Sequence, residues 1–365
     1  MAIAPDERLR RKSWLARQLS RPDLGAISGA LLVFAFFAIV AGNSGMFAPD
    51  GVQNWATVSA ELGIIATGAA LLMIAGEFDL SIGSMIGFSG MMIAIPATYY
   101  HWPIWVAIVF AFLCAMTIGA LNGFIVVRTR LPSFIVSLAF LFILRGLTLA
   151  LSILFSNRTI VSGFKEIAGN DWLGDLFGGR IGYPLFQWLS NEGIIGKFKD
   201  GTPLVSGVPM SIVWWLALTA IGSWVLTRTV FGNWIFASGG DVNAARNMGV
   251  PVNQVKILLF VVTAFCATVF ATCQVIEFDS AAADRGQLKE FEAIIAAVIG
   301  GNLLTGGYGT VIGASFGALI FGVVQMGIFY TNVNTDWFRV FLGVVLLIAV
   351  AFNTYVRNKV TGSQM

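Results

Sequence analysis

The chain has 365 residues, of which 57% are hydrophobic and only 11% are charged, less than half the roughly 25% typical of a soluble domain. A water-soluble core cannot absorb so much apolar surface, so the composition excludes an ordinary soluble protein. The net charge is only +3 and the basic residues form no single patch, which excludes a nucleic-acid partner. The three cysteines lie in apolar stretches and predict neither a disulfide framework nor a metal site: Cys114, Cys266 and Cys273.

Basic residues dominate the start of the chain. The stretch RLRRKSWLARQLSR resembles the charged region of a signal peptide, but the apolar run at 25–41 is longer than a usual signal core. We therefore expect a retained first span that follows a tail at 1–24. Because positive residues stay on the cytoplasmic side of a membrane, this tail is expected in the cytoplasm.

Apolar stretches of about 20 residues recur along the chain, as a hydrocarbon layer of about 30 Å requires. They predict an all-α polytopic membrane protein with about ten transmembrane helices in one domain over 25–356. The expected spans are 25–41, 55–76, 80–96, 104–126, 132–155, 209–227, 256–276, 289–303, 309–330 and 337–356. An even number of crossings also places the tail at 357–365 in the cytoplasm, and Arg128 and Arg130 fall in a loop on that side. The polar stretch at about 156–208 is expected to be an outer loop.

Two polar, glycine-containing stretches break the apolar pattern: one at 76–80, within GEFDLSIGS (76–84), and one at 303–309, LLTGGYG. Each could be a re-entrant turn or a full exit to water. Broken backbone is tolerated in a membrane only where it is buried in protein or lines water, and transporters build internal sites from such helices. Glycines spaced by four follow both breaks, as close helix packing in lipid requires: Gly83 and Gly87, then Gly309, Gly313 and Gly317. The candidate substrate-pathway residues are Glu77, Phe78, Asp79, Ser81 and Asn302.

The first break contains two carboxylates, which are costly in hydrocarbon and usually face a protein interior or a water-filled path. Asp79 has two interpretations. It is a pathway residue, or it caps the helix that begins near Leu80 by accepting free backbone N–H groups; we favour the cap. For Glu77, a pathway role and a place in a solvated inner loop are equally supported.

A second informative stretch, GGDVNAARNMGV, follows the sixth predicted span on the cytoplasmic side. Its two glycines are expected to end an irregular piece. Asp241 can then cap a helix over about 242–248, and Gly249 can end that helix before Pro251. The pattern predicts a short helix across the inner surface within 239–250, for which a simple connector is the favoured interpretation from the residues alone.

These two motifs, together with EFEAIIAAVIGGNLLTGGYGTVIGASFGALIFG, resemble the permease subunits of bacterial ATP-driven importers for monosaccharides, of the ribose, xylose, fructose and inositol type. The resemblance covers roughly residues 52–350, with the motifs in family-like order. It implies a multi-pass protein of the bacterial inner membrane whose fold is similar to that of the vitamin B12-type (type II) importers. It also implies that the chain translocates a monosaccharide or polyol, whose hydroxyls suit carboxylate acceptors.

The same resemblance implies partners: a second copy of the chain, a cytoplasmic ABC ATPase, a sugar-binding protein outside the membrane, and lipid. The short helix matches the segment that docks into the ATPase, which assigns this coupling role to Asp241, Asn243, Ala244, Ala245, Arg246 and Gly249. The chain departs from the family in two places. Glu77 and Phe78 stand where the commoner form has Gly-Ile, and the outer segment at about 164–200 is longer than in many relatives.

The chain has no GxxxxGK[ST] loop for nucleotide phosphates. We therefore expect no cofactor in this chain, with ATP and Mg bound by the partner ATPase. An ion-coupled secondary transporter is an alternative, but the coupling-like segment argues against it. An intramembrane enzyme is a further alternative, with Glu77 and Asp79 as an acid/base pair, although the sequence contains no HExxH motif and predicts no catalytic residue.

Two further charges lie inside predicted spans. Arg145 is expected roughly 20 Å from the inner surface, and Glu61 about 9 Å from the outer surface, so in a core of about 30 Å the two depths coincide. An isolated charge at such a depth costs roughly 2.5 kcal/mol or more. We predict that both side chains face the bundle interior, where they either pair with each other or contact the aqueous path.

Overall fold

The computed structural model of the protein describes residues 22–168, 171–334, 336–341, 343–344 and 347. Within this part of the chain, seven helices are long and apolar enough to cross a membrane. They are α3 (Pro49–Ile74), α4 (Ile82–Tyr99), α5 (Ile104–Thr129), α6 (Ser133–Ser156), α10 (Met210–Arg228), α13 (Val252–Phe278) and α15 (Val311–Tyr330). A further apolar helix, α2 (Pro22–Val40), covers the first expected span. The prediction of a helical, polytopic membrane protein is therefore confirmed.

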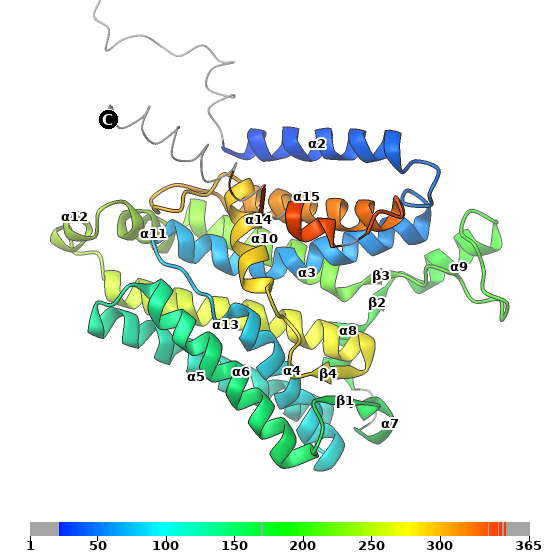
Figure 1. Ribbon diagram of the computed structural model, residues 1–365, viewed down its shortest axis with the longest axis horizontal. Coiled ribbons are helices and arrows are strands. Elements are labelled where there is room, and N and C mark those ends of the chain that lie inside the picture. The colour runs from blue at the N-terminus through cyan, green and yellow to red at the C-terminus, as the bar shows by residue number, and fades with distance from the viewer. Residues whose placement is uncertain (1–21, 169–170, 335, 342, 345–346, 348–365) are drawn as a thin grey trace, which may run out of the picture.

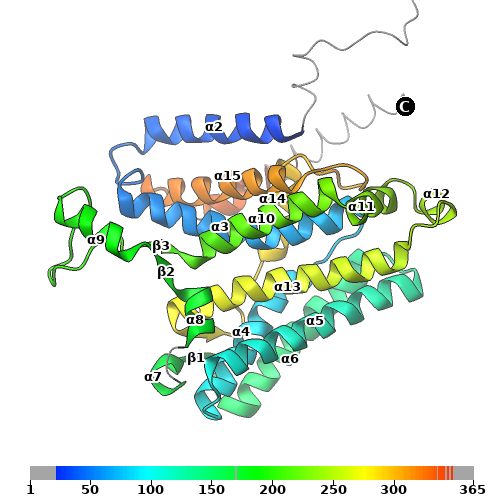
Figure 2. The same cartoon turned by 180° about the vertical axis from the view of Figure 1, so that it is seen from behind.

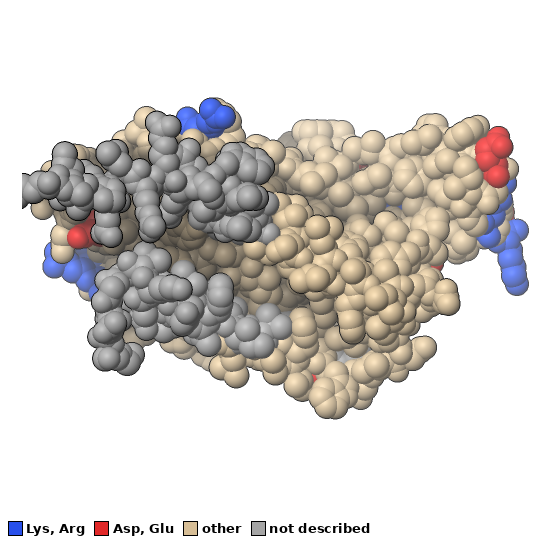
Figure 3. Space-filling model, turned by 90° about the horizontal axis from the view of Figure 1, so that it is seen from above, with Lys and Arg blue, Asp and Glu red and all other residues tan. Residues whose placement is uncertain are grey.

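Most of the long helices run roughly along the longest axis of the molecule, whereas α4 is steeply inclined to it (Figure 1). The short helices α11 (Val230–Gly240) and α12 (Val242–Asn247) lie at one end, which we call the α12 end. The opposite end, the α9 end, carries α9 (Tyr183–Asn191), as the view from behind also shows (Figure 2). Charged atoms on the face seen in Figure 3 gather mainly at these two ends, with an uncharged band between them, as expected for a protein surrounded by lipid.

The expected outer loop at 156–208 contains short elements at the α9 end. Strand β1 (Ile160–Ser162) pairs antiparallel with β4 (Ser280–Ala282), and β2 (Arg180–Ile181) pairs antiparallel with β3 (Val208–Pro209). Helices α7 (Phe164–Ala168) and α8 (Trp172–Gly178) lie between β1 and β2 in the chain. Because β1 pairs with β4, this segment is attached to the chain just beyond α13. The expected outer loop is therefore an ordered segment with its own short elements.

Three sequence-based expectations need comment. The span expected at 289–303 is wrong, because α14 (Lys289–Ile299) has only 11 residues and at 1.5 Å per residue extends about 16 Å, half of a hydrocarbon core. The irregular piece expected before Asp241 is helix α11. Most of the span expected at 337–356, and all of the two terminal tails except residues 22–24, lie outside the described residues.

Helix α14 is held between two glycine ladders. A Cβ atom on Gly83 of α4 would lie 1.8 Å from the Oε2 atom of Glu290. On the other side, a Cβ atom on Gly313 of α15 would lie 2.0 Å from the carbonyl oxygen of Gly300, and one on Gly317 would lie 1.9 Å from that of Ala296. Both predicted glycine ladders therefore serve close packing of helices. The segment that packs against them is the shortened helix α14 with its two ends.

Candidate functional site

The two interrupted segments meet at the α12 end. The N–H of Gly307 donates to the carbonyl oxygen of Ile74 at 2.8 Å, across the two breaks. Gly76, Gly306 and Gly307 have φ values of +83°, +78° and +74°, which favour glycine. A Cβ atom on Gly239, near the end of α11, would lie 1.9 Å from the Ile74 oxygen and 2.6 Å from the Gly307 nitrogen. We call Gly76, Gly239, Gly306 and Gly307 the glycine junction.

From the junction, the chain turns back into the bundle before α4 begins. The N–H of Phe78 donates to Ser133 Oγ, at the first residue of α6, at 3.0 Å. Asp79 then reaches Asn122, which lies about 10 Å before the end of α5. The first break therefore enters the protein interior from the α12 end, so helix α4 starts inside the bundle.

Asp79 is the centre of a buried polar cluster. Its Oδ1 atom accepts the backbone N–H of Ser81 at 2.9 Å and the Ser81 hydroxyl at 2.6 Å. Its Oδ2 atom accepts the Thr263 hydroxyl of α13 at 2.6 Å, and the Asn122 amide lies 3.4 Å from Oδ1. Helix α4 begins at Ile82 with Ser81 at its N-cap position, so the bond from the Ser81 N–H stabilises the turn before α4 and is not the predicted helix cap. The other bonds join the start of α4 to α5 and α13.

Glu77 forms an ion pair with Lys256 near the start of α13, and both side chains are 13% exposed. It is thus neither solvated nor isolated, and its predicted role in the pathway stays a prediction. Phe78 packs against an apolar cluster that includes Met73 and Ala297. At the first break, Glu77 therefore has a charged partner, whereas its neighbour Phe78 has apolar ones.

Asn302 is fully buried just after α14. Its Nδ2 atom donates to the carbonyl oxygen of Ala297 at 2.9 Å, and its backbone N–H donates to the same oxygen at 3.1 Å, so Asn302 closes the end of the helix twice. Its Oδ1 atom has no hydrogen-bond partner among the described residues, and a Cβ atom on Gly309 would lie 1.9 Å from it. Asn302 therefore holds the second break together, while Asp79 holds the first.

The direct pair expected between Glu61 and Arg145 is not formed. Glu61 accepts a hydrogen bond from Gln274 of α13 at 2.8 Å, and Arg145 pairs with Glu290 of α14 at 3.0 Å. Helix α6 packs on α4, whereas α3 packs on α13, α14 and α15. Of the two predicted alternatives, the direct pair is therefore wrong, because equal depth does not place two residues on neighbouring helices; contact with the aqueous path stays a prediction.

Further charges surround Glu61 and were missed in the sequence. Lys289, Glu277 and Arg285 lie close enough for their charges to act on it. Glu277 in turn pairs with Arg180 of β2 at 3.2 Å. The signal was available, since 277–292 holds charges in an otherwise apolar region, but only the folded path of α14 brings them to Glu61.

The predicted short helix at the α12 end is confirmed. The Oδ1 atom of Asp241 accepts the N–H groups of Asn243 and Ala244 at 2.8 and 3.0 Å, and Gly249 ends the turn with a φ of +81°. Of the side chains assigned to coupling, Asn243, Ala244 and Arg246 are exposed, whereas Ala245 is buried. Met248 is 84% exposed and was missed; a large apolar side chain presented to solvent is typical of an interaction surface.

Among the described residues, no group of three His, Cys, Asp or Glu side chains could hold a metal ion. Glu61, Glu77, Asp79, Arg145 and Asp241 each bond to other groups of the protein. The arrangement is therefore suited to holding two broken helices in one geometry, with α12 joined to them through Gly239.

Comparison with known proteins agrees with this architecture. The profile of the family described as "Branched-chain amino acid transport system / permease component" matches residues 51–350. The xylose transport system permease protein XylH of Escherichia coli K12 is 27% identical over 368 residues, covering 91% of this chain and 92% of that protein. The ribose import permease protein RbsC of the same organism is 29% identical over 340 residues, covering 93% and 94%. The inner membrane ABC transporter permease protein YjfF, also from that organism, is 30% identical over 302 residues, covering 82% of each chain.

Proposed function

This chain belongs to the family of branched-chain amino acid transport system permease components, and from that premise we propose that it is the membrane-spanning subunit of an ATP-driven importer for a monosaccharide or polyol. It is a transport permease and not an enzyme. The family description mentions amino acids, whereas the relatives XylH and RbsC are named for xylose and ribose. Similarity to these two sugar permeases over more than nine-tenths of the chain is the observation that carries the proposal.

The proposed assembly contains two copies of this chain, two ATPase domains and one sugar-binding protein in the inner membrane of a bacterium, with both termini cytoplasmic. ATP and Mg belong to the ATPase, because this chain lacks a phosphate-binding loop. In this orientation the α12 end faces the cytoplasm, which agrees with the arginines there: Arg128, Arg130, Arg228 and Arg246.

The test is uptake into proteoliposomes that contain this chain, with the ATPase and binding protein encoded beside it. We expect ATP-dependent uptake of one of ribose, xylose or inositol, and no uptake of leucine as the amino acid control. Uptake of leucine alone would favour the other substrate class of the family. Full-rate sugar uptake without the ATPase, driven by an ion gradient, would contradict the proposal.

Residues 239–250 are proposed to dock into the ATPase. Support comes from the exposed face of α12 and from Gly239, which packs against both broken segments at the junction. A displacement of α12 would thus act directly on the two interruptions. Reversing an exposed charge with Arg246→Glu should weaken ATPase association while the permease stays folded, and unchanged association and transport would contradict the docking role.

The conformation of Gly249 offers a second test of the same segment. No neighbouring atom lies within 4 Å of a Cβ atom built on it, so only its backbone angle resists substitution. We expect Gly249→Ala to cost about 1 kcal/mol and to lower ATPase association, and Gly249→Asn to be tolerated better, because asparagine adopts this conformation more readily.

For the substrate pathway, we propose that Glu77 and Lys256 form part of its closure at the α12 end, and that Phe78, Asp79, Ser81 and Asn302 shape the two breaks that border it. Asp79 is 5% exposed, and donors already occupy both of its oxygens. Direct contact between Asp79 and sugar would require breaking these bonds. Glu77→Gln should therefore alter transport rate with the ATPase attached, while Asp79→Ala should lower folded yield.

A further inference from the structure

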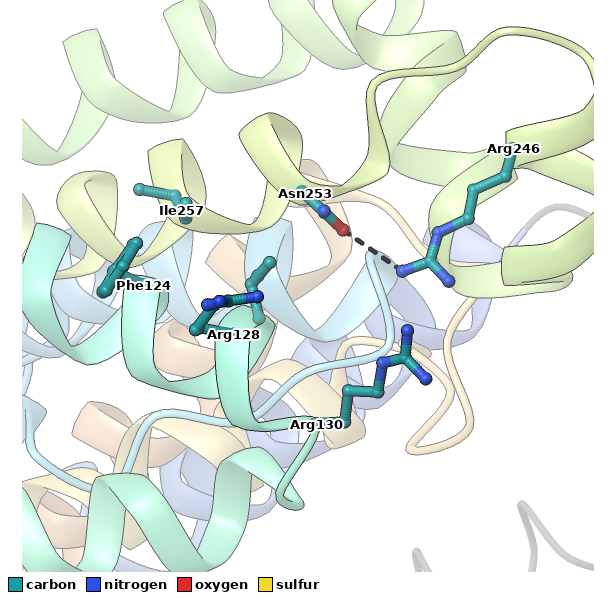
Figure 4. Close-up of a pocket in the computed structure, with 7 residues that line it drawn as sticks. Phe124, Arg128, Arg130, Arg246, Asn253 and Ile257 are labelled. Carbon is teal, nitrogen blue, oxygen red and sulfur yellow. Dashed lines mark hydrogen bonds between the residues drawn. The ribbon is translucent and has the colours of Figure 1, made fainter.

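A cavity of about 510 Å³ opens at the α12 end between the end of α5, α12 and the start of α13. Figure 4 shows the side chains that line it: Arg128 and Arg130 come from the end of α5, and Arg246 comes from α12. Arg246 donates to Asn253 at 3.1 Å. Arg130 is the C-cap of α5 in the left-handed conformation, so the chain turns sharply at the rim of the cavity.

The cavity has an excess of positive charge. A smaller adjoining space of about 210 Å³ is lined by Arg130, Arg246, Lys256 and a single carboxylate, Glu77. That carboxylate is already paired with Lys256. Among the described residues, no salt bridge involves Arg128, Arg130 or Arg246. Three exposed guanidinium groups therefore face one space without an opposite charge, which is the electrostatic footprint of an anion site.

The floor of the same cavity is apolar. Phe124, which is 53% exposed, and Ile257 line it from α5 and α13. Leu121, about one helical turn deeper than Phe124 on the same face of α5, is 49% exposed. Because both helices are long enough to cross a membrane, this apolar strip runs from the arginines toward the middle of the bilayer.

We infer that this cavity, the arginine cavity, binds the phosphate group of an anionic phospholipid, with an acyl chain along Phe124 and Ile257. A free phosphate ion would match the arginines but leave the apolar strip unused. An acidic segment of the ATPase could also pair with the arginines, but it would leave the apolar strip uncovered, because that strip lies on membrane-spanning helices. Basic pockets between membrane helices at the cytoplasmic surface are known to bind such headgroups. The inference concerns lipid binding and is independent of which solute the permease carries.

The experiment uses the purified full chain in detergent and measures the binding of phosphatidylglycerol and phosphatidylcholine with identical acyl chains, by native mass spectrometry. The unmodified chain should retain phosphatidylglycerol in preference. Each basic residue near an anionic surface contributes about five-fold in affinity, so Arg128→Gln with Arg130→Gln should reduce the preference by about 25-fold.

Three controls make the result specific. Arg228→Gln removes an exposed arginine at the end of α10, outside the cavity, and should leave the preference unchanged. The double variant Arg128→Lys with Arg130→Lys keeps both charges and should retain most of the preference for phosphatidylglycerol. It therefore distinguishes a loss of charge from a loss of folding. A short-chain phosphatidylglycerol and inorganic phosphate should both compete more weakly than the long-chain lipid if the apolar strip takes part.

Two results would overturn the inference. Equal competition by inorganic phosphate would make the cavity a site for a free anion. An unchanged lipid preference in the double Gln variant, whether or not that variant loses ATPase association, would show that the arginines do not hold lipid; loss of association would then assign the cavity to the ATPase.

Discussion

Arg145 on α6 and Glu290 on α14 form an ion pair, with Nη2 and Oε1 separated by 3.0 Å. The Glu290 side chain is 1% exposed and that of Arg145 is 29% exposed. The second carboxylate oxygen of Glu290 has no hydrogen-bond partner among the described residues. Arg145 therefore compensates a buried charge at the start of the shortened helix, and its loss would leave that charge unpaired.

We expect Arg145→Gln and Glu290→Gln each to lower the thermal stability of the permease in detergent, with the larger loss for Arg145→Gln. The double variant should lose less than the sum of the two, by a coupling free energy of about 1–3 kcal/mol. Glu61→Gln combined with Arg145→Gln is the matched control, and its effects should add, because Glu61 bonds to Gln274. Additive losses in the first cycle would show that the ion pair contributes no coupling.

The features that depend on local chemistry were predictable. The cap by Asp241, the stop at Gly249 and the two polar breaks follow from residue types and their spacing, and the structure confirms them. The glycine ladders were predictable as contacts, because lipid leaves close packing of small residues as the means of joining helices. The segment that packs against these ladders, α14, could not be predicted.

The partners of the buried charges depend on the path of α14. The run 289–303 is mostly apolar, but a local signal ends its helix at Ile299: Gly301 has a φ of +88°, and the N–H groups of Gly301 and Asn302 donate to the carbonyl oxygens of Val298 and Ala297. Gly300 also packs against Gly313, which fixes this turn against α15, and that contact could not be read from the sequence. With a full span assumed, Glu290 would lie at the membrane surface, and Arg145 would have no visible partner except Glu61. The network around Asp79 was missed for a similar reason, since it requires the relative register of α4, α5 and α13.

Gly313→Ala should be strongly destabilising, because the added methyl group would lie 2.0 Å from the carbonyl oxygen of Gly300 and the helices would have to separate. We expect a loss of about 2 kcal/mol or more, within the range for overpacking a close contact. Gly146→Ala on α6 is the control, since no neighbouring atom lies within 4 Å of its Cβ position. Thermal unfolding in detergent, followed by loss of the monodisperse species, measures both. Equal midpoints for the two variants would mean that the α14–α15 contact is not tight.

Thr263→Val should weaken the cluster at the start of α4. It removes the 2.6 Å hydrogen bond to Asp79 Oδ2 and leaves a buried carboxylate oxygen without that donor, at a cost of about 1–3 kcal/mol. In Thr148→Val, the lost hydroxyl bonds only to the carbonyl oxygen of Leu144 in its own helix, so a smaller loss is expected. The comparison is made on folded yield and thermal stability, and a Thr148→Val variant as unstable as Thr263→Val would remove the special role of Asp79.

Gly239→Ala should separate ATP hydrolysis from transport. The added Cβ atom would lie 1.9 Å from the Ile74 oxygen and 2.6 Å from the Gly307 nitrogen, whose 2.8 Å contact joins the two breaks. Since α12 remains exposed and correctly capped, the ATPase should still bind, but the end of α11 could no longer fit against the junction.

Gly240→Ala is an adjacent control in the same helix, with no neighbouring atom within 4 Å of its Cβ position. We expect Gly239→Ala to reduce transport at least ten-fold in proteoliposomes, a change of about 1.4 kcal/mol, while ATP hydrolysis and ATPase association fall much less. Normal transport by Gly239→Ala, or an equal defect in Gly240→Ala, would show that the junction does not link α12 to the interrupted helices.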